Sequence, residues 1–96
     1  MTSQEFRNSL ESDSADPALN PLLHALWWDA KGNWTRAHEI AQEIESPEAA
    51  WVHAYLHRKE GDVSNAAYWY SRAGRPQCKE GIEVEWLVIA DHLLRA

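Results

Sequence analysis

The sequence predicts an all-α fold: two antiparallel helical hairpins with a capping helix at the N-terminal and at the C-terminal end. The first observation is an internal repeat, in which one set of residues recurs after 29 positions: His24-Ala25, Gly32-Asn33 and Ala37 return as His53-Ala54, Gly61-Asp62 and Ala66. Self-similarity at a period of roughly 20 to 50 residues is typical of stacked helical units. The second observation is that apolar residues follow helical spacing, while no segment alternates with the period of a strand.

Two short motifs predict where the first helix of each hairpin begins. Asn20-Pro21 and Ser46-Pro47 each place a capping side chain before a proline, which is favoured at the first helical position. Each helix then runs to the glycine of its repeat, because glycine tolerates the left-handed backbone that ends a helix. The second helix of each hairpin begins behind the Asn or Asp that follows this glycine and can serve as its N-cap.

The remaining segments supply the two caps. Residues 1–16 form a polar N-terminal segment with one short helix, anchored by Phe6 and Leu10 four positions apart. We expect residues 17–96 to form a single helical-repeat domain, with repeats over about 19–46 and 47–74 and a capping helix over about 81–95. That last helix is apolar over much of its circumference, so a structural homodimer and a monomer are both open.

The two repeats resemble the tetratricopeptide repeat (TPR) family over roughly residues 19–74. Each unit carries the turn glycine, an aromatic or apolar residue two positions on and an alanine three positions later: Gly32, Trp34 and Ala37, then Gly61, Val63 and Ala66. The period of 29 is shorter than the family's 34 or so, and Ala41 stands where the family prefers an aromatic residue. The run from His53 to Asp62 also resembles small bacterial proteins that have no known activity. The resemblance implies a TPR-like α-α superhelix.

The resemblance further implies a peptide-binding groove along the first helices of the hairpins. Carried onto this sequence, the groove comprises seven residues: Leu22, Leu26, Asp29, Trp51, Tyr55, Arg58 and Lys59. Aromatic side chains beside arginine are common anchors of interfaces, and Arg58 and Lys59 can take a carboxylate. Packing of Trp51 and Tyr55 on the flanking helices is the alternative. We therefore expect a non-catalytic module without cofactor that binds a protein or peptide partner, and not an enzyme.

The histidines support a different hypothesis. His53 and His57 lie one helical turn apart, a spacing that can place two imidazoles on one metal ion. His24 is the repeat equivalent of His53, so the alternative is a small metal-binding or hydrolytic protein that uses His24, His53 and His57. His38-Glu39 opens like a zinc-protease motif, but Gln42 replaces the second histidine. The motif fails, and we expect His38 to be a helix-surface residue.

Charge and composition exclude several classes of partner. The net charge of −6 disfavours nucleic acid and anionic membranes, both of which need clustered Lys and Arg. Asp91 and His92 interrupt the longest apolar stretch near the C-terminus, so we expect no transmembrane helix. The N-terminus is polar and acidic, unlike a signal or transit peptide. A single cysteine, Cys78, excludes an internal disulfide framework and favours the reducing cytoplasm.

Overall fold

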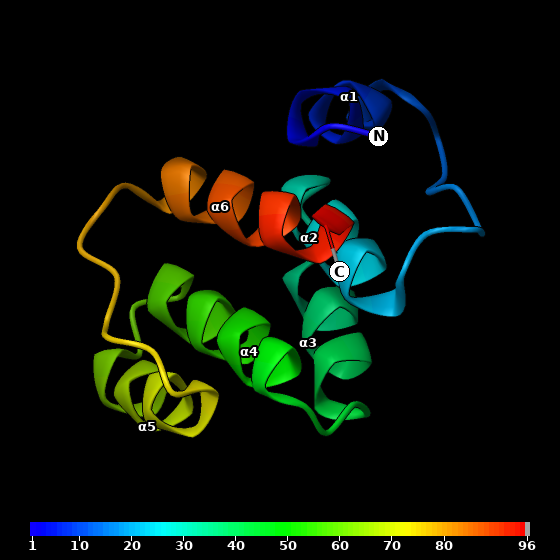
Figure 1. Ribbon diagram of the computed structural model, residues 1–96. Coiled ribbons are helices and arrows are strands. Elements are labelled where there is room, and N and C mark those ends of the chain that lie inside the picture. Colours follow the sequence, from blue (N-terminus) through cyan, green and yellow to red (C-terminus); the bar gives the residue numbers. More distant parts are fainter. Residues whose placement is uncertain (96) are drawn as a thin grey trace.

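The computed structural model describes residues 1–95, and all their regular structure is helical (Figure 1). The elements are α1 (Ser3–Asn8), the 3-10 turn η1 (Ser9–Glu11), α2 (Pro21–Ala30), α3 (Trp34–Gln42), α4 (Pro47–Lys59), α5 (Val63–Ala73) and α6 (Ile82–Arg95). The prediction of an all-α fold is confirmed, and no strand occurs among these residues. Within the same range, no helix has the length and apolar character needed to cross a membrane.

Local signals in the sequence set the helix boundaries. The side chains of Asn20 and Ser46 accept hydrogen bonds from the backbone N–H groups of Leu22 and Ala49, so each caps a helix that begins with proline. Behind α4, Gly61 has a φ of 92°, a left-handed backbone that strains any residue with a side chain. The chain therefore leaves α4 and enters α5 within a few residues.

Helix α4 is the centre of the molecule. Helix α2 packs on α3, α3 on α4, and α4 on α5, while α6 lies across this arrangement and contacts α1, α2 and α4 (Figure 1). Every residue of α4 from Ala49 to His57 is buried as a result. The apolar core lies where α2, α4 and α6 meet, and the opposite side of α4 faces α3 and α5.

Aromatic side chains fix the two terminal helices to this core. Phe6 of α1 is fully buried and stacks on Trp86 of α6, with ring centroids 5.3 Å apart. Trp86 Nε1 donates a hydrogen bond of 2.9 Å to the carbonyl oxygen of Leu26 on α2. Helix α1 therefore packs on α6, and α6 packs on α2.

A buried carboxylate ties α6 to α4 and α5. Glu85 is 1% exposed and accepts hydrogen bonds from Trp51 Nε1, the Tyr70 hydroxyl and Arg58 Nη1, at 3.3, 2.6 and 2.8 Å. Burial, followed by the hydrogen bond to Glu85, raises the pKa of Tyr70, so the phenol keeps the proton that it donates. A buried charge without such partners destabilises a fold, and this network therefore specifies where α6 lies.

Candidate metal centre

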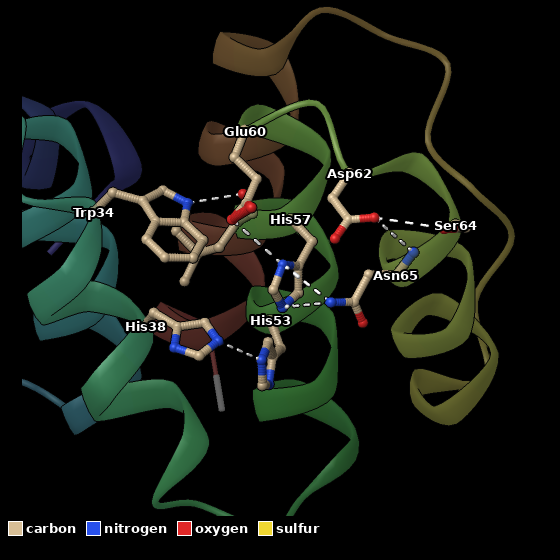
Figure 2. Close-up of polar contacts among 9 residues, drawn as sticks. Trp34, His38, His53, His57, Glu60, Asp62, Ser64 and Asn65 are labelled. Carbon is tan, nitrogen blue, oxygen red and sulfur yellow. Dashed lines mark hydrogen bonds and ion pairs between the residues drawn. The ribbon is translucent and has the colours of Figure 1, made fainter.

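Three histidines from two helices converge on the side of α4 that faces α3 and α5 (Figure 2). His38 comes from α3, whereas His53 and His57 lie one turn apart on α4. Each offers a ring nitrogen, and these three nitrogens all lie within 4.8 Å of one another. Among residues 1–95, no fourth histidine, cysteine or carboxylate offers a donor atom within that distance of all three. We call these residues the histidine triad.

The rings of the histidine triad are in direct contact. His53 Nε2 and His38 Nε2 are 2.8 Å apart, so one of the two rings donates a hydrogen bond to the other. The rings of His53 and His57 stack with their centroids 4.9 Å apart, and the ring of His38 stands edge-on to both. The three imidazoles therefore form one contiguous cluster.

Two tryptophans hold the triad from either side. Trp34 stacks on His38 at a centroid distance of 4.9 Å, and its Nε1 donates a hydrogen bond of 2.8 Å to the Leu56 carbonyl oxygen. Trp69 of α5 stacks on His53 at 3.9 Å with the planes 13° apart. These contacts fix the orientation of both imidazoles, since a flat ring packed against another flat ring has few alternative rotamers.

Polar side chains at the turn between α4 and α5 surround His57. Glu60 Oε2 lies 3.4 Å from His57 Nδ1, and Figure 2 shows Glu60 on the opposite side of the ring from His38 and His53. The amide nitrogen of Asn65 lies 3.4 Å from His57 Nε2. Asp62 is also close, but its carboxylate accepts from the Asn65 backbone N–H as the N-cap of α5. Asp62 thus has a structural role, whereas Glu60 is placed to orient His57.

Two histidines of the triad, His38 and His53, favour the uncharged imidazole. Burial, together with the neighbouring His38 and His57, lowers the pKa of His53 to about 4. Burial and the proximity of His57 also lower the pKa of His38. A neutral imidazole presents a lone pair, so at neutral pH His38 and His53 hold the protonation state that binds metal.

A surface cleft reaches the triad at His53. The cleft has a volume of about 550 Å³ and lies between the end of α3, the start of α4 and α5. We call it the Trp69 cleft, and its lining includes Ala41, Gln42, Ala49, His53, Trp69 and Arg72. Solvent and small molecules therefore have a route to one of the three histidines.

The structure places His24 and His38 differently from the sequence-based expectation. His24 lies away from the triad, and its Nε2 is 2.8 Å from the carbonyl oxygen of Asp16. His38, expected on the helix surface, takes the third place beside His53 instead. One signal pointed to it: His38 follows Trp34 by four positions, so both lie on the inward face of α3.

The seven residues of the predicted groove lie mostly beneath α6. Five are buried, namely Leu22, Leu26, Asp29, Trp51 and Tyr55. Arg58 pairs with Glu85, and Lys59 pairs with Asp29 at 3.1 Å, where the Tyr55 hydroxyl also donates at 2.9 Å. Burial, then the charge of Asp29, raises the pKa of Tyr55. Only part of this set, near Lys59, borders a second cleft of about 240 Å³ between α1, α2, α4 and α6.

Comparison of the chain with protein-family models, with curated proteins and with solved structures found no match.

Proposed function

We propose that the protein binds a divalent transition-metal ion, zinc in the first instance, through His38, His53 and His57. The observation that carries this proposal is the convergence of three imidazole nitrogens from α3 and α4 within 4.8 Å. Imidazole nitrogens suit zinc, copper and nickel, and three histidines are an established ligand set for zinc.

The distance between His38 and His53 fits a metal ion after a small adjustment. Zinc–nitrogen bonds of about 2.0–2.1 Å in tetrahedral geometry place two ligand nitrogens about 3.3 Å apart. His38 Nε2 and His53 Nε2 are 2.8 Å apart, because a hydrogen bond joins them. Binding then replaces that proton by the metal and separates the two nitrogens by roughly half an ångström.

Glu60 supports the proposal from outside the ligand set. Histidines that bind metal commonly donate their other ring N–H to a carboxylate, which fixes the tautomer and raises the basicity of the ring. The carboxylate of Glu60 lies 3.4 Å from His57 Nδ1, so it can hold the proton there. The ion would then take Nε2 in place of the Asn65 amide nitrogen, which lies 3.4 Å from that atom. Trp34 and Trp69 stack on the other two ligands, His38 and His53, and fix the orientation of their rings.

Metal titration of untagged protein tests this function. We expect one equivalent of Zn²⁺ in calorimetry or in competition with a chromophoric chelator, and loss of that equivalent in His38→Ala. His24→Ala is the matched control, because His24 lies outside the triad and belongs to the alternative ligand set. Equal loss of zinc in both variants, or no stoichiometric binding by the native protein, contradicts the proposal.

We also propose that the scaffold is TPR-like, with α2–α3 and α4–α5 as its two repeats. The inner alanines of both units, Ala37 and Ala66, are buried, which lets the paired helices approach closely.

The protein- or peptide-binding role expected of such repeats is a second candidate function, favoured by the cleft near Lys59, which Arg7 also lines. Screening of C-terminal peptides tests it: Arg7→Ala is expected to weaken binding about tenfold, and Lys79→Ala is not. Equal affinities for both variants contradict this role.

The homodimer expected from the last helix stays a prediction. Val84 and Val88 lie exposed one turn apart on α6 and are the apolar contacts that such a dimer would use. Sedimentation equilibrium at micromolar concentration distinguishes a homodimer from a monomer. If the native protein is a dimer that associates through α6, Val88→Asp dissociates it, whereas the mass of a monomer is unchanged by this substitution.

A further inference from the structure

We propose that the metal-loaded triad hydrolyses small uncharged aryl esters that bind in the Trp69 cleft. The proposal rests on the metal site proposed above and assigns that site a reaction and a substrate class. It departs from the sequence-based expectation of a non-catalytic protein. Three observations carry it: the number of ligands, the charge of the ligand set and the composition of the cleft.

The ligand count leaves one position on the ion open. Zinc binds four ligands, and the described part of the chain offers three donor nitrogens within 4.8 Å of one another. Sites with three protein ligands and a water are the catalytic type, whereas structural zinc sites have four protein ligands. The Glu60 carboxylate lies beside His57 Nδ1, on the side of that ring away from His38 and His53, so it does not fill the fourth coordination position (Figure 2).

The charge of the ligands favours an activated water. Three neutral imidazoles leave the full charge of the ion uncompensated, and such an ion lowers the pKa of a bound water to about 7. The stacked rings of Trp34 and Trp69 form apolar walls beside the ligands, which further strengthens the electrostatic effect of the ion. A hydroxide nucleophile is therefore available near neutral pH.

The composition of the Trp69 cleft indicates an uncharged substrate. Its volume of about 550 Å³ lies within the range of small-molecule sites. Small side chains at Ala41, Ala49 and Ala50 leave room beside the broad ring of Trp69. The charges that line it, Glu45 and Arg72, offset each other, so neither a polyanion nor a cation is favoured. A flat ester with an apolar acyl group fits these features.

The reaction balances with water as the only co-reactant. The hydroxide oxygen forms a bond to the ester carbonyl carbon, and the bond between that carbon and the aryloxy oxygen breaks. The products are a phenolate and a carboxylic acid that carries the proton of the hydroxide. The acid releases this proton to the solvent and becomes a carboxylate, and the phenolate takes up a proton from the solvent when its pKa lies above the pH. A second water then enters the open position and releases its proton to the solvent, which restores the site.

Hydrolysis of 4-nitrophenyl acetate by protein loaded with one equivalent of Zn²⁺ tests the proposal. We expect kcat/KM at least tenfold above that of His38→Ala mixed with the same zinc, and a rate that rises with pH through an apparent pKa of about 7. Zinc content is measured on each sample before the assay. Stoichiometric zinc without excess hydrolysis overturns the ester hydrolysis and leaves the metal site standing, whereas absence of zinc overturns both.

A pair of neighbouring exposed residues tests the role of the cleft. Gln42 lines the Trp69 cleft and Glu43 does not, although both are exposed at the end of α3. Gln42→Trp is expected to obstruct the cleft and lower kcat/KM at least tenfold with unchanged zinc affinity. Glu43→Trp adds the same bulk outside the cleft and is expected to retain the native rate. Equal rates in the two variants overturn the assignment of the substrate to this cleft.

Discussion

Lowering the pH is expected to destabilise the metal-free protein because His53 binds a proton more readily in the unfolded chain than in the folded one. Burial lowers the pKa of this histidine from 6.5 to about 4 in the folded protein. Between these values the unfolded chain binds more protons than the folded one, so stability falls as the pH drops from 6.5 toward 4. The full shift of about 2.5 units corresponds to about 3 kcal/mol, at 1.36 kcal/mol per unit. At pH 4.5 about 2.5 kcal/mol of this is already lost.

Urea unfolding followed by tryptophan fluorescence, in the presence of a chelator, measures this loss. His53→Gln removes the titrating ring and retains a polar side chain of similar reach, so it isolates the contribution of His53 from that of the carboxylates. We expect the native protein to lose about 2.5 kcal/mol more than the variant between pH 7.5 and pH 4.5. Parallel pH profiles for the two proteins would refute the account of His53 as a buried neutral imidazole.

Three further predictions each concern a single residue. Glu60→Gln is expected to weaken zinc binding 10- to 100-fold without loss of fold, since the carboxylate no longer orients His57; calorimetry and circular dichroism check this. Phe6→Ala removes a fully buried ring and is expected to cost about 3–5 kcal/mol in urea unfolding, whereas a loss below 1 kcal/mol would show that α1 is not part of the core. Gly61→Ala is expected to lower the free energy of unfolding by about 1–2 kcal/mol, because φ is 92° at this position. Gly81→Ala is the control, since a side chain there also meets open space but the backbone is not left-handed. Equal thermal unfolding of the two variants would contradict the strained turn.

The helix boundaries could be predicted from the sequence because local chemistry determines them. A capping Asn or Ser before proline begins α2 and α4, and a glycine ends each of them, so residues within a few positions carry all the information. The all-α class follows from the same signals. The packing of α3 on α4 and the burial of Ala37 and Ala66 are likewise consistent with the 29-residue repeat.

The composition of the candidate site could be predicted only in part. His53 and His57 share one helix, and their spacing alone brings them together. The third partner depends on how α3 packs on α4, and the repeat pointed to His24 where packing brings His38. Similarly, the predicted groove ignored α6, whose Glu85 reaches Arg58 across 27 positions of the chain. Long-range contacts of this kind leave no periodic signal in the sequence.

The most direct test of the metal site is X-ray absorption spectroscopy of protein loaded with one equivalent of Zn²⁺. We predict a first shell of three imidazole nitrogens at about 2.0–2.1 Å and one oxygen from water, with fewer imidazoles in His38→Ala. A shell that contains the sulfur of Cys78, or one dominated by carboxylate oxygens with fewer than three imidazoles, would contradict it.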